Sequence, residues 1–297
     1  MGCCSRCRCC RCLAIFLFNA ALVVGTLPGY IFAKLALCCG VCKPIRRRSC
    51  RRWIVFKMVA MGWRFVFCVA CWIRIRKEGF QCARKMMGAS GRPVVLVGNH
   101  LSFLDTMLVL VSVPPHLLAD MKVFAAGRLK RMPVLGTLLR AMGHLLVPFK
   151  TDTQTGGWEV DKEVMARRQL QLEEHIRQGG IAAWFPEGKL NDQNPLEVLQ
   201  FRAGGFSLPA KLDVEIWCLA FVGNQDCWPR QAAFGGAPAT IDIGIFSLCA
   251  SSHELLATGP GLEDEREASV FLADKARDAI QNAIKRLAAQ GRFSGKE

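Results

Sequence analysis

The sequence predicts an α/β fold built around one sheet, with an apolar, basic segment in front of it. From Pro93 onward, short apolar runs alternate with longer segments of helical periodicity, which is typical of strands and helices that cover each other. Residues 94–97 form an unbroken aliphatic run, as expected of a strand buried on both faces. We therefore expect a membrane-anchoring segment over residues 1–92 and the sheet-containing domain over residues 93–297.

The net charge of +15 is concentrated in the first part of the chain. Residues 1–92 hold 18 Lys and Arg against one acidic residue, whereas residues 93–297 hold 21 against 23. Basic residues beside long apolar runs favour an anionic bilayer surface. Nucleic acid is the other usual partner of a basic segment, but the neighbouring apolar sequence is of transmembrane length, so we do not expect it.

Cysteine is concentrated in the same part of the chain, with 13 of the 16 residues before position 83. The remainder is cysteine-poor, which argues against a secreted disulfide framework and for a reducing, cytosol-facing location. Gly2, Cys3 and Cys4 open the chain like an acylation signal, although Arg6 stands where that signal has Ser or Thr. Two alternatives stay open for the cysteines: a membrane edge without a chemical role, and Cys-x2-Cys metal pairs.

Two apolar stretches lie in the first 92 residues. Residues 13–33 carry no charge and are long enough to cross a bilayer, with a break expected at Pro28. Basic clusters flank this stretch on both sides, so the positive-inside rule leaves a crossing and a re-entrant hairpin open. Residues 53–73 are interrupted by Lys57 and Arg64, which favours an interfacial helix; the alternative is a helix packed on the body of the protein.

Behind a linker at residues 88–93, apolar runs and helical periodicity predict the remaining elements. The expected strands are Val94–Gly98, Leu118–Val123, Leu145–Phe149, Ile181–Phe185, Val214–Phe221 and Thr240–Ile245, and the expected helices are Ser102–Val111, Gly136–Met142, Asp161–Gln178 and Asp264–Ala289.

The first strand leads into a candidate catalytic pair. Gly98 and Asn99 end the strand, and Ser102 with Asp105 three residues later predicts the start of a helix. His100 therefore lies on the turn between them, where Asp105 can reach its imidazole and fix the tautomer. No serine or cysteine nearby is placed for activation, so the pattern favours a histidine base that deprotonates a substrate hydroxyl. The alternative is a helix cap beside an exposed histidine.

Asn99-His100-Leu101-Ser102-Phe103-Leu104-Asp105 resembles the N-H-x-S-x-x-D box of the glycerolipid acyltransferases, the family of 1-acylglycerol-3-phosphate acyltransferases. Downstream, Phe185-Pro186-Glu187-Gly188 resembles the second box of that family, in the same order. The resemblance covers about residues 93–225. It implies a central mixed sheet flanked by helices, with an N-terminal helical membrane-binding segment.

The resemblance also implies the reaction. The family transfers a fatty acyl group from a coenzyme A thioester, or from acyl carrier protein, to the hydroxyl of a lysolipid, without a metal or redox cofactor. His100 would be the general base, oriented by Asp105. The expected location is a cytosol-facing membrane, which in a eukaryote would be the endoplasmic reticulum or a related compartment. The first acceptor we expect is 1-acylglycerol-3-phosphate, giving phosphatidic acid. No protein partner is predicted.

Further residues follow from the same comparison of motifs. Phe185, Pro186, Glu187 and Gly188 would form the acceptor pocket, where the family continues with Thr and Arg. Lys189 and Leu190 stand there instead, so the phosphate-binding arginine is missing, and Lys189, Arg202 or Lys150 would supply the positive charge.

Three alternatives to this function remain. A remodelling enzyme for a lysophospholipid with another head group would not need the missing arginine. A catalytically silent membrane scaffold could keep the fold. A cysteine hydrolase that uses His100 lacks a nucleophile-elbow pattern.

Overall fold

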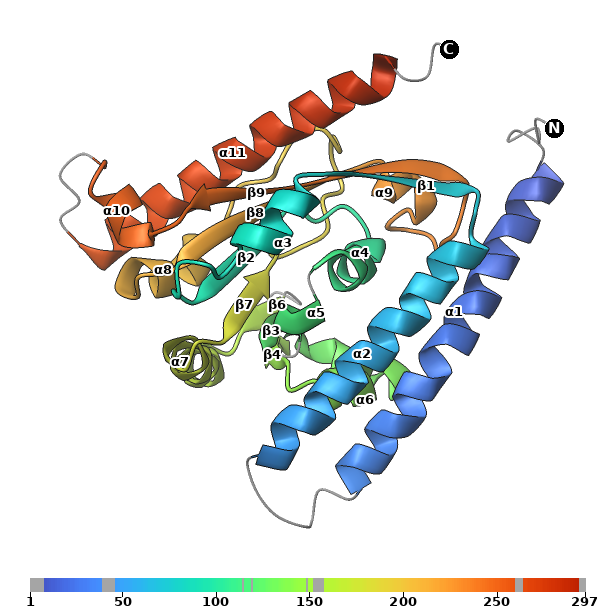
Figure 1. Ribbon diagram of the computed structural model, residues 1–297, viewed down its shortest axis with the longest axis horizontal. Helices are drawn as coiled ribbons and strands as arrows, with labels where there is room; N and C mark the ends of the chain where they lie inside the picture. Colours follow the sequence, from blue (N-terminus) through green and yellow to red (C-terminus); the bar gives the residue numbers. More distant parts are fainter. Residues whose placement is uncertain are drawn as a thin grey trace.

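The computed structural model describes residues 8–38, 46–113, 115–118, 120–147, 149–151, 158–259 and 264–293. Seven strands of this part of the chain form one mixed sheet in the order β1-β9-β8-β2-β7-β3-β4 (Figure 1). All neighbours pair in parallel except β8 and β9, which pair antiparallel. The strands are β1 (Ile73–Glu78), β2 (Val94–Gly98), β3 (Met121–Ala126), β4 (Leu145–Val147), β7 (Ile181–Trp184), β8 (Glu215–Val222) and β9 (Ala239–Cys249), with β5 (Phe149–Thr151) and β6 (Trp158–Val160) as a separate antiparallel pair.

Helices cover both faces of the sheet. The α-helices are α1 (Arg8–Cys38), α2 (Arg46–Val69), α3 (Phe80–Met86), α4 (Leu104–Ser112), α5 (Pro115–Leu118), α6 (Pro133–Ala141), α7 (Lys162–Arg177), α8 (Ser207–Lys211), α9 (Asn224–Cys227), α10 (Ser252–Leu256) and α11 (Glu265–Phe293). Two 3-10 helices, η2 (Gly127–Arg131) and η3 (Ala203–Phe206), complete the described elements.

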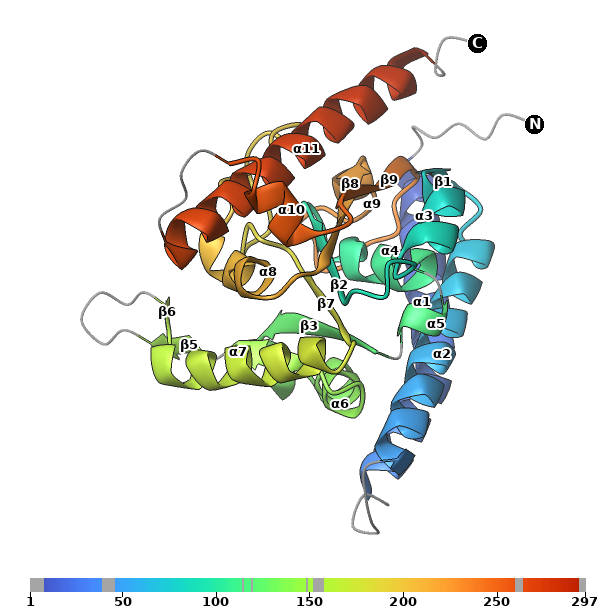
Figure 2. The same cartoon turned by 60° about the vertical axis from the view of Figure 1, so that its left-hand side comes forward.

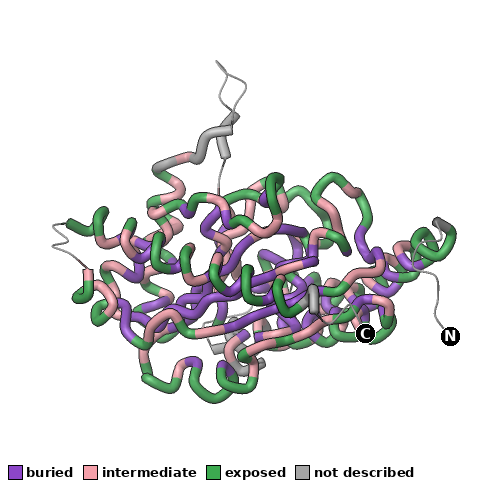
Figure 3. The backbone as a smooth tube through the Cα atoms, turned by 90° about the horizontal axis from the view of Figure 1, so that it is seen from above, coloured by how far each residue is buried: buried purple, intermediate pink, exposed green. Residues whose placement is uncertain are grey.

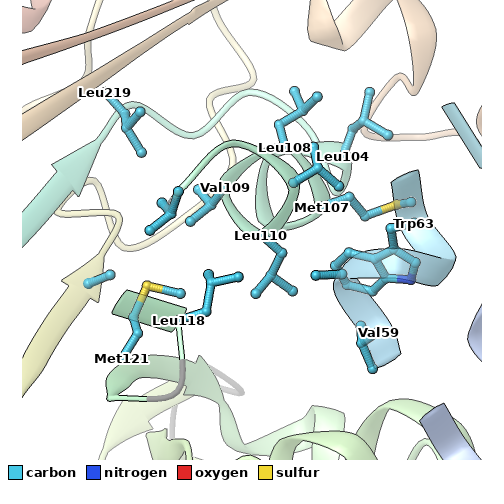
Figure 4. Packing of buried hydrophobic residues seen from close by; sticks show 14 of the residues in the cluster. Val59, Trp63, Leu104, Met107, Leu108, Val109, Leu110, Leu118, Met121 and Leu219 are labelled. Carbon is cyan, nitrogen blue, oxygen red and sulfur yellow. The ribbon is translucent and has the colours of Figure 1, made fainter. Parts of the chain in front are cut away.

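The core consists of two apolar layers, one on each face of the sheet. On one face, Leu104 and Leu108 of α4 pack with Val59 and Trp63 of α2 and with Leu219 of β8 (Figure 4). On the other face, α7 and α11 cover the alternate side chains of β2 and β8. Figure 3 shows the buried backbone running through the middle of the molecule between exposed outer helices. The expected α/β architecture around one sheet is confirmed.

Most expected strands are present, several with other bounds, and two strands, β1 and β6, were not predicted. The strand expected over 118–123 begins only at Met121, because 115–118 form α5. The strand expected over 145–149 corresponds to two strands, β4 and β5, which belong to different sheets. β1 was not predicted, because the sequence places Ile73 in the preceding apolar stretch and residues 74–77 in the basic segment, although Ile73 and Ile75 alternate with basic residues. The sheet therefore begins before the boundary that we expected at residue 92.

The apolar front forms a pair of long helices that lie side by side along one flank of the molecule (Figures 1 and 2). The expected break at Pro28 is wrong, because α1 continues through this residue. Within the described residues, one helix, Cys9–Cys38, is long and apolar enough to cross a membrane, with a mean hydropathy of 1.9. A Cβ on Gly62 of α2 would lie 1.8 Å from the Gly25 carbonyl oxygen, so only glycine permits this close crossing.

The second stretch, expected as an interfacial helix over 53–73, ends at Val69 as α2 and is followed by β1. Val59 and Val66 of this helix are fully buried, and Trp63 donates a hydrogen bond from Nε1 to Thr26 Oγ1 of α1 at 3.1 Å. The helix therefore packs on the body of the protein, which is the alternative left open by the sequence. Trp53, Met61 and Phe65 remain exposed on its outer side.

Candidate active site

The carboxyl end of β2 is fixed to the neighbouring strand by one buried side chain. Asn99 donates from Nδ2 to the Phe221 carbonyl at 3.0 Å and accepts the Phe221 N–H at 2.8 Å. A Cβ on Gly98 would lie 3.1 Å from Leu219 Cβ, so a larger residue would push β2 away from β8. The chain leaves the sheet here, and the next residue, His100, lies on the connecting turn.

His100 and Asp105 are in contact as expected. His100 Nδ1 lies 2.9 Å from Asp105 Oδ2, and the same oxygen accepts the N–H groups of Leu101 at 2.8 Å and Ser102 at 3.0 Å. Asp105 is fully buried, whereas the His100 side chain is 20% exposed. Because Asp105 is an acceptor, it fixes the tautomer with the proton on Nδ1 and leaves the Nε2 lone pair available.

The helix start at Ser102 was placed two residues too early. α4 begins at Leu104, and the Ser102 hydroxyl accepts the Leu104 N–H at 3.2 Å while it donates to the Trp228 carbonyl at 2.7 Å. The Asp105 carboxylate accepts the Ser102 backbone N–H at 3.0 Å. The turn that carries His100 is therefore held at both ends by side-chain hydrogen bonds.

The turn that follows β7 packs against His100. The imidazole stacks on the Phe185 ring, with the centroids 4.1 Å apart and the planes at 6°. Glu187 Oε1 accepts the His100 backbone N–H at 2.7 Å, and Oε2 accepts the Leu199 N–H at 3.3 Å. Glu187 is 3% exposed, and burial raises its pKa to about 7. The carboxyl group thus joins three segments of backbone.

Arg202 lies next to the turn at Gly188. Gly188 has a φ of +69°, and a Cβ there would lie 2.7 Å from Arg202 Nε. The Arg202 backbone N–H donates to the Pro186 carbonyl at 2.9 Å. Its exposed guanidinium has no ion-pair partner among the described residues.

Lys189 points to a different partner. Its Nζ lies 3.4 Å from Asp192 Oδ1, and Asp192 also pairs with Arg230 at 2.5 Å. Lys150 belongs to β5, but its side chain lies outside the described part of the chain, as do Gly2, Cys3 and Cys4.

Two residues at the site were not predicted. Asn224, the first residue of α9, is fully buried and donates from Nδ2 to Asp105 Oδ1. Its position after the apolar strand β8 was the available signal, since β2 and β8 are parallel and end at the same edge. Trp228 packs edge-on against Phe18 of α1, with ring centroids 6.2 Å apart, and lies 6.1 Å from the Phe103 ring. This tryptophan connects the long apolar helix to the turn that carries His100.

Comparison with known proteins agrees with this geometry. A family model described as Acyltransferase matches residues 74–222, about half of the chain. A 1-acyl-sn-glycerol-3-phosphate acyltransferase from Chlamydomonas reinhardtii is 25% identical over 201 residues, which are 68% of this chain and 51% of that protein. The chain therefore spans about half the length of the curated relative that it matches.

The fold also resembles a solved structure. The crystal structure of the 1-acyl-sn-glycerophosphate acyltransferase PlsC from Thermotoga maritima superposes with a TM-score of 0.63 at 16% sequence identity. The match covers 94% of this chain and 96% of the PlsC chain. This similarity confirms the predicted fold class, a mixed sheet flanked by helices and preceded by a long apolar helix.

Proposed function

The chain belongs to the acyltransferase family, and on that premise we propose that it transfers a fatty acyl group from acyl-CoA to the hydroxyl of a lysophospholipid. The observation that carries this proposal is the contact of 2.9 Å between His100 Nδ1 and the buried carboxylate of Asp105. The pair lies at the carboxyl edge of the parallel strands, where α/β sheets bind their ligands.

The proposed reaction is a direct transfer with His100 as general base. The acceptor hydroxyl gives its proton to His100 Nε2 as its oxygen bonds to the thioester carbonyl carbon. The carbon–sulfur bond then breaks, and the coenzyme A sulfur leaves as a thiolate that recovers the proton from the imidazolium. Asp105 stabilises the imidazolium between these two steps. Base catalysis of this kind contributes about 10²–10⁴-fold to a rate.

Glu187 and Asn224 act as positioning residues in this proposal. Glu187 holds the His100 backbone against the turn that follows β7, and Asn224 holds the second oxygen of Asp105. Both side chains are buried, so we assign neither of them a contact with substrate. Phe185 supports the flat face of the imidazole and limits its rotation.

The first acceptor we propose is 1-acylglycerol-3-phosphate. Arg202 supports this choice, since it lies over Gly188 without an ion-pair partner among the described residues, and its planar fork suits a phosphate. Lys189 is less suited, because Asp192 holds its ammonium group. A lysophospholipid with another head group is the second candidate, and it is favoured by Leu190 at the position where the resemblance implies arginine.

We further propose that the chain binds an anionic membrane at a cytosol-facing surface. α1 is apolar over the length of a bilayer, and the exposed fractions of Phe16 and Val23 are 67% and 66%. The same helix contacts the segment 228–237 that follows α9, where Asn19 donates from Nδ2 to the Gly235 carbonyl at 2.9 Å. Membrane attachment and the candidate site are therefore connected through the segment 228–237, which would bring His100 close to lipid acceptors.

Acyl transfer from labelled acyl-CoA to a panel of lysolipids tests the proposal. Membranes that contain the wild type should acylate lysophosphatidic acid, and those with His100→Ala should not. His253→Ala is the matched control, since His253 is exposed on α10 and contacts none of the residues of the site. Activity confined to other lysolipids would reject the proposed acceptor. Absence of His100-dependent transfer to any acceptor would reject the enzyme and favour the scaffold.

A further inference from the structure

A second candidate site lies near the amino-terminal ends of β3 and β4, on the side of the sheet where β4 is the outer strand. An open groove of about 620 Å³ is bounded by Lys122 of β3, by His144 at the start of β4, and by Arg168, Gln171 and Glu174 of α7. Figure 2 shows α7 alongside β3. Lys122 is in register with Ala182 and, through it, with Val95, five residues before His100. At about 3.3 Å per residue and about 4.8 Å per strand, the groove lies roughly 20 Å from the catalytic pair.

Three cations gather at this groove without ion pairs. Lys122 and Arg168 line it, and Arg52 of α2 lies directly behind, where a Cβ on Gly143 would be 3.3 Å from its Nε. Within the described residues, none of the three forms a salt bridge. The one carboxylate on the wall, Glu174, accepts a hydrogen bond from Gln178 Nε2 at 2.6 Å. The carboxylate of Asp120 interacts electrostatically with Arg52. Three cations therefore face two carboxylates, Glu174 and Asp120, and the cluster keeps an excess of positive charge.

Two of these guanidinium groups contain buried N–H donors without an acceptor. Arg52 donates from Nε to the Met142 carbonyl at 2.9 Å, but its Nη2 is buried and has no partner among the described residues. The same holds for Arg168 Nε. Burial and the charge of Arg52 lower the pKa of Lys122. Unpaired buried donors and crowded like charges are both unfavourable. A bound anion would satisfy the Arg168 Nε donor and offset the like charges of Lys122 and Arg52.

His144 adds a neutral donor to the same wall. Its Nδ1 accepts the Val123 N–H at 3.3 Å, so the proton of the neutral ring resides on Nε2. Burial lowers the His144 pKa to about 3, which keeps the ring neutral at physiological pH. The groove thus offers guanidinium, ammonium and imidazole N–H groups, the donor set that suits a multivalent oxyanion.

We propose that this groove binds a phosphate group, either as free inorganic phosphate or as part of a larger molecule such as a nucleotide or a lipid head group. Arg168 and Lys122 contact the anion directly, and Arg52 compensates its charge from behind. The site is separate from the acyl-transfer centre and does not depend on the proposed reaction.

Thermal unfolding of the full chain in neutral detergent tests this proposal. The unfolding midpoint should rise with inorganic phosphate and approach a plateau, whereas chloride at equal ionic strength should not raise it. A double variant, Lys122→Met with Arg168→Met, keeps the apolar stems but removes two charged contacts, so its apparent Kd should be about tenfold to a hundredfold weaker. Arg167→Met is the matched control, because Arg167 pairs with Glu163 on the exposed side of the same helix.

Two outcomes would overturn the site: equal responses to phosphate and chloride in the wild type, or a double variant that responds to phosphate like the wild type. Two further ligands identify the source of the phosphate. Stronger stabilisation by adenosine 3′,5′-bisphosphate than by phosphate, where the double variant loses the difference, indicates a nucleotide in the groove. Stronger stabilisation by glycerol 3-phosphate, likewise lost in the double variant, indicates a lipid head group. Equal stabilisation by all three indicates free phosphate. None of these measurements depends on acyl transfer, so a failure here leaves the proposed function untouched.

Discussion

Replacing Asp105 with asparagine isolates the charge behind His100. The carboxylate accepts hydrogen bonds from His100, Leu101 and Ser102 on Oδ2 and from Asn224 on Oδ1. An amide oxygen can take over the three contacts of Oδ2. The new amide NH2 would face Asn224, whose Oδ1 is buried without a partner in the described structure, so a flip of the Asn224 amide restores the missing hydrogen bond. We therefore expect Asp105→Asn to fold.

The variant loses the negative charge that stabilises the imidazolium during transfer. Two unit charges about 4 Å apart, at an effective dielectric constant of about 20, interact by about 4 kcal/mol. Since about 1.4 kcal/mol corresponds to a factor of ten, kcat should fall by up to about a thousandfold. The assay is acyl transfer at saturating acyl-CoA and lysophosphatidic acid, with the unfolding midpoint measured on the same preparation.

The control for this variant is Asp192→Asn, which removes an exposed carboxylate that is paired with Arg230 and lies away from the imidazole. Its kcat should stay within about threefold of the wild type, because exposed ion pairs contribute little. A well-folded Asp105→Asn variant with a kcat within threefold of the wild type would refute the role given to the carboxylate.

Three further predictions concern positioning, anchoring and the acceptor. Burial raises the pKa of Glu187 in the folded protein to about 7, above its ordinary value of 4.5. The free energy of unfolding of the wild type should therefore fall by up to about 3 kcal/mol relative to that of Glu187→Gln as the pH rises from 4.5 to 7. The same pH dependence of unfolding in both proteins would contradict this. Gly62→Ala should lower the free energy of unfolding by about 1–3 kcal/mol, because its Cβ would overlap the Gly25 carbonyl. Gly204→Ala is the control, since a Cβ there has open space around it and should leave the free energy of unfolding unchanged. Equal unfolding midpoints for the two variants would refute the tight crossing of α1 and α2. Arg202→Ala should raise the KM for lysophosphatidic acid about tenfold and leave the KM for lysophosphatidylcholine unchanged; equal effects on both would reject the phosphate contact.

The sequence was sufficient to predict the central strand and the contact between His100 and Asp105, because both depend on local order. The aliphatic run predicted a strand over Val94–Gly98, and β2 has these same bounds. A spacing of five residues across a turn places His100 beside Asp105. The long amphipathic pattern likewise predicted α11, although the helix extends to Phe293.

The parts that could not be predicted depend on contacts between distant residues. β1 has only two apolar residues, Ile73 and Ile75, and is stabilised at the sheet edge by the Arg76–Asp242 ion pair, whose members are 166 residues apart. Asn224 lies 119 residues after Asp105 and reaches it only because β2 and β8 are neighbours. Pro28 looked like a helix end because its lost hydrogen bond is costly in isolation, but α1 packs along α2 and continues.

The central claim is that His100 is the base of an acyl transfer, and its most direct test is the rate of that step in purified protein. We would measure kcat for transfer from acyl-CoA to the preferred lysolipid in the wild type, His100→Ala and His253→Ala, together with acyl-CoA binding and the unfolding midpoint. We expect that His100→Ala loses about 10²–10⁴-fold in kcat while it binds acyl-CoA and unfolds like the wild type, and that His253→Ala is unchanged. A folded His100→Ala protein that binds acyl-CoA and transfers the acyl group at the wild-type rate would contradict the account.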